Sequence, residues 1–562
     1  MFIIFKMAKR GILILLGIIL VGFILRFYQL GAIPQGFQVD EAAFGYNTYS
    51  LIKTGADEYG KKYPITFRSF DDYKAALYSY VDIPFVAVLG LSEAAVRLPS
   101  AIAGIFLILL SYAITLSLTK DRKLSLLTAF FIAISPTLIF QNRIQSEAVL
   151  SFTLFFAGLF FFLEWIKNKK ISYFVLSLFL WAFSILAYTG TRSFLILFIP
   201  LLIIYLRKSF SKNWLGILTL GLIILFILNV FLIKEGNQRF NQVSVFNSYD
   251  QKITLFEETT NGGSSVPGWD RVIHNKGTVY GRAIAANYFS YFNFNFLFFN
   301  ATYPVREAVE NTGFLYLIDL PLLFIGIYEI IRKKVKWGFF LILWILITPA
   351  SLALFSTESP NIHRFIPAIL PLLLISAYGA LEALELVKKQ KKAYRVTLIL
   401  IPLLLFLNLF YFLDELFIHQ AGHFPKERNH AFKQLITDLS SLESNYKQIV
   451  LTTSQANTYI FYLFYNKYDP KKYQELGSPG NKNGIIFGKY SFIHEPCPLS
   501  GGWQGLDEVK GEKGILYVDS GDCVTPKYYI KMVEVINWHD NTPAFKLMEY
   551  DPTNIKRHVQ NP

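Results

Sequence analysis

Long apolar runs separated by short polar connections fill the first three quarters of the chain. A helix needs about 20 mostly apolar residues to cross a bilayer, and eleven runs come close to that length. They lie at about 11–30, 96–118, 123–140, 147–166, 171–188, 191–206, 214–233, 312–331, 337–355, 363–387 and 396–417. The pattern therefore predicts a polytopic α-helical membrane protein with about 11 transmembrane helices, which occupy residues 1–417.

The pattern changes after about residue 418. Short runs with alternating or buried character predict strands there, and a run at 455–465 predicts a helix. The strands are expected at 448–453, 484–493, 514–519, 532–537 and 544–550. We therefore expect a C-terminal α/β domain at 418–562. It carries no phosphate-binding glycine motif, so we assign it to acceptor recognition or stability.

Among the short connections, lysine and arginine lie mainly on one alternate set. That set holds 21 of them, whereas the short connections of the other set hold only Arg143, Arg192 and Arg364. Cytoplasmic connections carry the excess of basic residues. We therefore predict a protein of the plasma (inner) membrane with a cytoplasmic N-terminus, outer loops at 31–95 and 234–311, and an extracytoplasmic C-terminal domain. The first run is too long for a signal-peptide core and is expected to stay as an anchor.

Composition agrees with a lipid environment. The 562 residues are 53% hydrophobic and 17% charged, whereas soluble domains are about a quarter charged. The net charge of +14 comes from the cytoplasmic connections, which argues against a nucleic-acid partner. Cys497 and Cys523 both lie in the C-terminal domain, where an extracytoplasmic location would permit a disulfide.

Acidic, aromatic and basic side chains gather in the first outer loop. Asp40 and Glu41 begin an amphipathic segment that predicts a helix on the membrane surface. Carboxylates are favoured at a helix start, so this pair is either structural or catalytic. Tyr73 and Lys74 follow. A lysine beside carboxylates and tyrosines can bind phosphate as a point charge, although a solvated charge cluster is the alternative.

Three further outer turns carry candidate residues. Each places an arginine at the outer end of a run, and such arginines often only extend toward the membrane surface. Together with Lys74 they would form a cationic pocket. The residues are Arg143 with Glu147, then Arg192, then His363 with Arg364. Glu147 would also fit the first turn of a helix. We find no ligand cluster with metal spacing, so we predict no obligatory metal and no other cofactor, with a divalent metal as the open alternative.

These motifs, in this order and on one side of the membrane, resemble the GT-C glycosyltransferase superfamily. The protein O-mannosyltransferases and the lipid A aminoarabinose transferases are the most similar families. There, an acidic motif opens the first outer loop, and a later lysine-containing segment contacts the donor phosphate. In this chain that segment is 72–78, with Ala75 and Ala76 where prolines are usual. The sequence VRLPS at 96–100 also resembles the family.

The resemblance implies an inverting glycosyltransferase that acts at the outer face of the membrane. It would move a sugar from a polyprenyl-phosphate-linked donor to a protein, lipid or glycan acceptor. Asp40 would be the general base. Glu41 would orient it or hold the surface helix, and Glu147 would position the acceptor or share the base role. The donor phosphate would contact Lys74, Arg143, Arg364, Arg192, Tyr73 and His363.

Three other functions fit parts of the pattern. A membrane transporter would need internal repeats and charges near the bilayer midplane, and apart from Asp319 the charges cluster at the outer ends of the runs. A non-catalytic envelope-assembly factor is a second alternative. An oligosaccharide ligase or polymerase that uses a pyrophosphate-linked donor is a third.

Overall fold

The computed structural model folds into two compact units, each of which is described by itself. It describes residues 9–70, 72–210, 216, 219, 221, 223, 225, 244–260, 269–301, 305–355, 359–423, 426–480, 482–501, 511–525 and 529–555. Residues 1–28 and 99–416 make the first unit, called here the helical unit. Residues 29–98 and 417–562 make the second, called the sheet unit.

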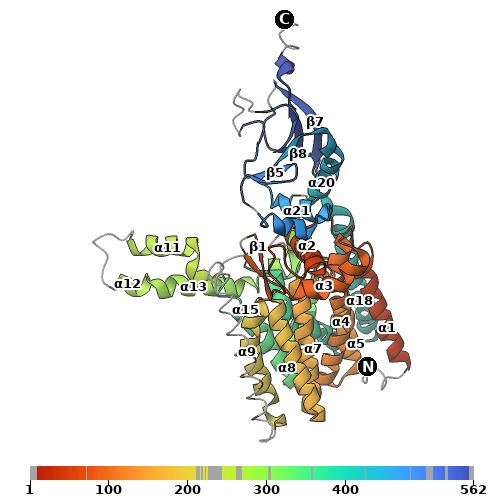
Figure 1. Ribbon diagram of the computed structural model, residues 1–562. Coiled ribbons are helices and arrows are strands. Elements are labelled where there is room, and N and C mark those ends of the chain that lie inside the picture. The colour runs from red at the N-terminus through yellow and green to blue at the C-terminus, as the bar shows by residue number, and fades with distance from the viewer. Residues whose placement is uncertain are drawn as a thin grey trace. The chain divides into compact units, whose positions relative to one another are not determined.

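The helical unit is an assembly of helices, most of them apolar (Figure 1). They are α1 (Lys9–Phe27), most of α4 (Glu93–Thr119), α5 (Arg122–Ile134), α6 (Pro136–Gln141), α7 (Glu147–Asn168), α8 (Ile171–Ala187), α9 (Gly190–Leu206), α11 (Tyr249–Thr260), α12 (Asp270–Ile273), α13 (Lys276–Ser290), α14 (Asp319–Arg332), α15 (Lys336–Ala350), α16 (Ile362–Phe365), α17 (Ile369–Val387) and α18 (Lys391–Asp414). Helix α7 packs along α8, and α14 along α17.

Several of these helices are membrane spans. Six helical segments in the described part are long and apolar enough to cross a bilayer, and α8 and α15 are shorter apolar helices. The chain is therefore a multi-pass membrane protein. Each predicted run overlaps a described helix except 214–233, which lies mostly outside the described residues. The count of about 11 stays a prediction.

Two predicted runs begin or break differently in the structure. The run at 123–140 is two helices, because Ser135 ends α5 and caps α6, accepting from the Leu138 N–H at 3.4 Å. Helix α14 begins only at Asp319, whose carboxylate accepts from Ser376 Oγ of α17 at 2.6 Å. A Cβ at Gly379 would lie 1.9 Å from the Leu322 carbonyl oxygen, so only glycine permits this close approach.

The sheet unit combines residues 29–98, which include the predicted first outer loop, with the C-terminal region. The loop contributes α2 (Val39–Thr54), the hairpin β1 (Thr66–Ser69) and β2 (Asp72–Ala75), and α3 (Leu77–Leu89). The C-terminal region contributes α19 (Gln420–His423), α20 (Ala431–Leu442), β3 (Gln448–Thr452), α21 (Thr458–Tyr465), α22 (Pro470–Glu475), β4 (Ile485–Phe487), β5 (Tyr490–Ile493), β6 (Ile515–Ser520), β7 (Ile530–Asn537) and β8 (Pro543–Tyr550).

The C-terminal strands form one six-stranded mixed sheet in the order β4-β5-β3-β6-β8-β7. Strand β3 is parallel to both β5 and β6, and the other neighbours are antiparallel. The predicted sheet-containing C-terminal region is therefore confirmed. The run at 484–493 is a hairpin of two strands.

The first outer loop and the C-terminal region share one hydrophobic core. The Phe37 and Phe464 rings lie 4.7 Å apart. A Cβ at Gly45 of α2 would lie 2.6 Å from the Phe464 ring of α21. This loop is therefore folded against the C-terminal region within the sheet unit, and the helix that begins near Asp40 has a buried side.

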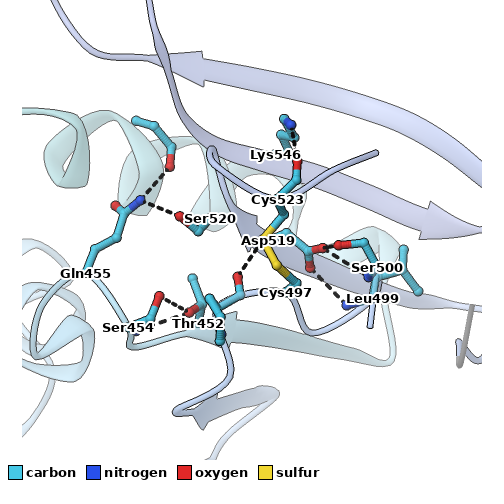
Figure 2. The surroundings of a disulfide bond; sticks show 12 residues. Thr452, Ser454, Gln455, Cys497, Leu499, Ser500, Asp519, Ser520, Cys523 and Lys546 are labelled. Atoms are coloured by element: carbon cyan, nitrogen blue, oxygen red, sulfur yellow. Dashed lines mark hydrogen bonds between the residues drawn. A yellow bond between two sulfur atoms is a disulfide. The ribbon is translucent and has the colours of Figure 1, made fainter. Parts of the chain in front are cut away.

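Cys497 and Cys523 form a disulfide (Figure 2). Next to it, the buried carboxylate of Asp519 accepts from the backbone N–H groups of Leu499 and Ser500 at 2.9 and 3.1 Å. The Ser500 hydroxyl donates to the same carboxylate at 2.5 Å. The disulfide and these bonds tie the chain before 501 to strand β6.

Candidate functional site

Helix α2 presents Asp40 from its first turn. The Gln38 backbone N–H donates to Glu41 Oε2 at 3.0 Å, which closes a capping box at the helix start. The Asp40 side chain is 48% exposed. Because Asp40 and Phe44 are four residues apart, they lie on the same face of α2.

Lys74 covers that face of the helix. In the β1–β2 hairpin Lys74 is paired with Phe67, so both side chains point to the buried side of the hairpin. The Lys74 ammonium forms an ion pair with the Asp40 carboxylate. It also lies 5.9 Å from the centre of the Phe44 ring and 5.0 Å from that of Phe70. Such cation–π contacts hold an ammonium in place.

Tyr73 has the opposite orientation. Successive residues of a strand point to opposite faces, and Tyr73 is 37% exposed whereas the Lys74 side chain is only 12% exposed. The described segment therefore brings Lys74 to Asp40 and leaves Tyr73 on the outer side of the hairpin.

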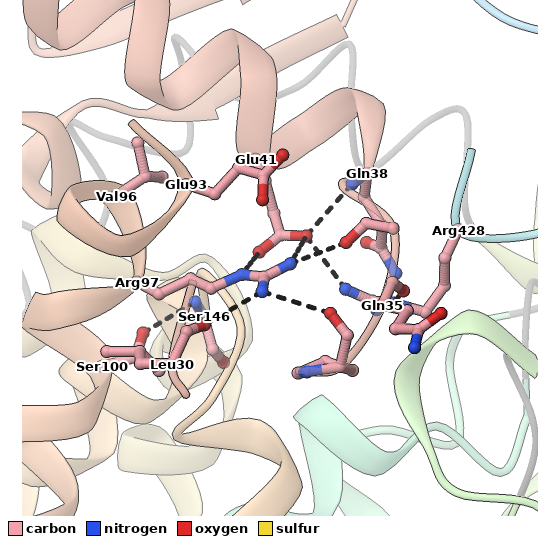
Figure 3. Close-up of polar contacts among 12 residues, drawn as sticks. Leu30, Gln35, Gln38, Glu41, Glu93, Val96, Arg97, Ser100, Ser146 and Arg428 are labelled. Atoms are coloured by element: carbon pink, nitrogen blue, oxygen red, sulfur yellow. Dashed lines mark hydrogen bonds and ion pairs between the residues drawn. The ribbon is translucent and has the colours of Figure 1, made fainter. Parts of the chain in front are cut away.

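Glu41 lies in the interior of the sheet unit (Figure 3). Its carboxylate pairs with Arg97 at 2.9 Å and with Arg428 at 3.0 Å. Burial by itself would raise the pKa of Glu41, but the two guanidinium groups outweigh it and lower the pKa below its ordinary value. A carboxylate enclosed by two guanidinium groups is poorly placed to exchange a proton with a substrate. These contacts give Glu41 the role of holding the helix.

The helical unit gathers a second set of charges around Tyr188. The side chains of Arg364, Glu147 and Glu307 all act electrostatically on the Tyr188 hydroxyl. Glu147 is the first residue of α7, where Ser146 provides the cap by accepting from the Val149 N–H. Arg364 and Glu147 are half-buried, so this cluster combines a cation with carboxylates in a partly enclosed position.

His363 and Arg364 both lie in α16 and differ in their partners. His363 Nε2 lies 3.3 Å from Glu307 Oε2. The Arg364 guanidinium lies over the Phe355 ring at 5.0 Å, and its charge also acts on Tyr291. A small cavity next to this pair is lined in part by Glu307, Thr137, Phe140 and Ile362. A guanidinium held over an aromatic ring is suited to an anionic group.

Arg143 and Arg192 have other surroundings. Arg143 is fully buried and donates to the carbonyl oxygens of Leu25 and Tyr28 at 2.8 and 2.6 Å, which ties it to the end of α1. Arg192 donates from Nε to the Ile185 carbonyl oxygen at 3.4 Å. These contacts give Arg143 a structural role, and its contact with a donor phosphate stays a prediction.

Sequence reasoning did not predict three residues of these charged clusters, namely Arg428, Glu307 and Tyr188. Arg428 is an ordinary cation between the last apolar run and the C-terminal sheet, and its partner Glu41 is 387 residues away. Glu307 lies in the long second outer loop without a flanking motif. Tyr188 lies in the same predicted turn as Arg192, and in that turn only the arginine carries a charge that suggests phosphate binding.

Comparison of the sequence with known protein families gives a match over part of the chain. A family model described as dolichyl-phosphate-mannose-protein mannosyltransferase matches residues 74–233, a segment that begins at Lys74 and excludes Asp40. No curated protein matches the sequence.

Solved structures match over most of the chain. ArnT from Cupriavidus metallidurans bound to undecaprenyl phosphate has a TM-score of 0.53 and 11% identity, covering 96% of this chain and 98% of that chain. Its apo state gives the same values. The Archaeoglobus fulgidus oligosaccharyltransferase in the apo form has a TM-score of 0.48 and 13% identity, covering 82% of this chain. This chain spans 64% of the length of that archaeal protein.

Proposed function

We propose that this chain, which has the fold of the GT-C membrane glycosyltransferases, transfers a sugar from a polyprenyl-phosphate-linked donor to a hydroxyl group of an acceptor. The observation that carries the proposal is the Asp40–Lys74 pair. It joins an accessible carboxylate to an enclosed cation, and both are described residues of one compact unit.

The chemistry needs one proton acceptor. The acceptor oxygen attacks the anomeric carbon, its proton goes to the Asp40 carboxylate, and the bond from that carbon to the phosphate oxygen breaks. The electron pair of that bond leaves with the polyprenyl phosphate, which is anionic and requires no proton. A positioned general base contributes about 10²- to 10⁴-fold in rate. A single displacement inverts the configuration at the anomeric carbon.

The cations stabilise the phosphate. Lys74 supplies an ammonium that its aromatic neighbours hold in a fixed place, which favours preorganised charge stabilisation. Separately, within the helical unit, Arg364 with His363 beside it is a candidate for binding an anionic group. Glu147 accompanies Arg364 around Tyr188 within the helical unit, and its role in positioning the acceptor stays a prediction.

The comparisons support the class of donor. The matching family description names a dolichyl-phosphate-linked mannose, and the ArnT structure was obtained with undecaprenyl phosphate. The basic connections support an outer-face location, with the N-terminus in the cytoplasm and the sheet unit outside the plasma (inner) membrane. The acceptor is a protein, a lipid or a glycan.

A reconstitution assay tests the proposal. The full-length protein in nanodiscs is given a panel of polyprenyl-phosphate sugars with envelope extract as acceptor, and products are identified by mass spectrometry. We expect release of free polyprenyl phosphate together with a glycosylated product of inverted anomeric configuration. Transfer from a polyprenyl-pyrophosphate donor alone would support an oligosaccharide ligase instead, and transport of an intact lipid-linked sugar would overturn the enzymatic proposal.

A further inference from the structure

Two arginines from distant parts of the sequence enclose the entry to helix α2 (Figure 3). Arg97 donates to the carbonyl oxygens of Pro34 and Gly36 at 3.2 and 2.7 Å and pairs with Glu41. Arg428 approaches the same segment from the C-terminal region. The residues between 34 and 41 are therefore fixed by guanidinium groups on two sides.

Arg428 makes a bridging contact. Its Nε donates to the Gln35 carbonyl oxygen at 3.1 Å, and its Nη2 donates to Glu41 Oε2 at 3.0 Å. The Arg428 and Glu41 side chains are 3% and 1% exposed. The Arg428 guanidinium thus joins the segment that precedes α2 to the first turn of that helix.

The backbone of Arg428 also contacts this entry. Gly36 has a φ of +81°, and a Cβ there would lie 2.4 Å from the Arg428 carbonyl oxygen. The close approach therefore requires glycine. Side-chain and backbone contacts of Arg428 both act on the five residues that precede Asp40.

The charges around Glu41 indicate that Arg428 does more than stabilise an ion pair. Glu41 already has a buried partner in Arg97, so Arg428 adds a second buried cation to a single carboxylate. Buried ion pairs recover little net stability against their desolvation, and apolar replacements are often as stable. The second guanidinium adds a geometric constraint. Its planar group donates to the Gln35 carbonyl oxygen and to the Glu41 carboxylate at the same time, which fixes the orientation of both.

We propose that Arg428 is a positioning residue for Asp40. It holds Glu41 and the Gln35 carbonyl group in one geometry, and Asp40 is the residue directly before Glu41 in the same helical turn. The C-terminal region thereby sets the direction of the carboxylate toward Lys74 and the acceptor hydroxyl. This inference rests on the proposed function, in which Asp40 is the base.

Two substitutions of Arg428 test the inference in the full-length protein. Arg428→Lys keeps the charge and loses the two-pronged contact, and Arg428→Gln removes the charge. We expect kcat to fall about tenfold or more with either, because small misplacements of catalytic groups have large effects. The KM for the donor and the affinity for polyprenyl phosphate should change less than twofold, and the acid limb of the kcat–pH profile should move.

Lys433→Gln is the matched control. Lys433 belongs to the same region and pairs with Glu93 at 3.3 Å, and it is 62% exposed. Its removal should leave kcat and the pH profile unchanged. If Arg428→Lys folds with wild-type kcat and an unmoved pH profile, the positioning role is excluded.

A double-mutant cycle separates this inference from the function on which it rests. If Arg428 acts through Asp40, Arg428→Gln should change the residual kcat of Asp40→Asn by less than twofold. Additive losses would mean that Arg428 acts elsewhere, while the base assignment would survive. Full activity of Asp40→Asn would instead remove the base assignment itself.

Discussion

The Lys74 ammonium pairs with the Asp40 carboxylate across 34 positions of sequence. The two partners differ in exposure, because the lysine side chain is enclosed by aromatic rings and the aspartate side chain is about half accessible. The carboxylate can therefore meet a substrate hydroxyl while its partner stays fixed. This relationship is the basis of the proposed chemistry.

Arg364 and Arg143 should respond differently to substitution. Arg364→Gln removes a half-buried cation backed by Phe355. A hydrogen bond to a charged group contributes about 1.5–3 kcal/mol, so we expect the KM for the polyprenyl-phosphate donor to rise about 10- to 100-fold, with little change in melting temperature. Steady-state kinetics and thermal unfolding in nanodiscs provide both numbers.

Arg143→Gln should instead impair folding. The two carbonyl oxygens that Arg143 satisfies would lose their donors in a buried position, at about 1–3 kcal/mol for each unsatisfied group. A lowered melting temperature with an unaltered donor KM is the expected result. A raised donor KM at normal stability would return Arg143 to the phosphate-binding set.

Glu58 should make the stability of the sheet unit depend on pH. Its buried carboxylate accepts from Asn47 Nδ2 and from the Tyr459 hydroxyl, both at 3.3 Å. Burial raises the pKa of Glu58 from 4.5 to about 7. The folded state therefore keeps a proton that the unfolded chain releases. The resulting stability is fully present below pH 4.5 and is lost as the pH rises through 7.

The difference between those pKa values corresponds to about 3 kcal/mol. Glu58→Gln keeps a neutral hydrogen-bonding group and should abolish this part of the pH dependence. Melting temperatures of wild type and variant, compared between pH 4.5 and 8.5, provide the measurement. Parallel curves for the two proteins would show that Glu58 carries no such proton.

The disulfide should stabilise the C-terminal sheet. Cys497 and Cys523 are 26 residues apart, and closing a loop of this size is worth about 3 kcal/mol in the chain-entropy model. The Cys497→Ser/Cys523→Ser variant should unfold at a lower temperature, and reductant should shift the wild type but not the variant. Neither cysteine belongs to α2 or to the β1–β2 hairpin. We therefore expect the kcat of the variant, measured below its unfolding temperature, to stay within twofold of wild type.

The sequence predicted those features that depend on local pattern. The apolar runs and the C-terminal strands follow from hydrophobic length and alternation, so α7 and β3 begin within a residue of the predicted positions. Asp40 and Lys74 can be predicted because each belongs to a short motif, the Asp-Glu pair at 40–41 and the segment at 72–78. Their ion pair is a tertiary contact, and the spacing of residues along the sequence does not predict it.

The remaining differences have physical causes. The run at 123–140 is interrupted because Pro136 lacks a backbone N–H and Ser135 caps the next helix. Arg143 lies at a predicted outer turn, yet its Nη1 and Nη2 groups donate to carbonyl oxygens at the end of α1. Arg428 has no sequence signal because a buried arginine is recognised only by the acceptors that surround it.

Replacing Asp40 with Asn, with Asp469→Asn as a control, tests the central claim most directly. Asp469 also begins a helix in the sheet unit, where it accepts from the Lys471 N–H at 2.8 Å, and asparagine caps helices equally well. With a polyprenyl-phosphate sugar as donor, Asp40→Asn should lower kcat by about 10²-fold or more and leave polyprenyl-phosphate binding intact, whereas Asp469→Asn should match wild type. Undiminished transfer by correctly folded Asp40→Asn would contradict the account.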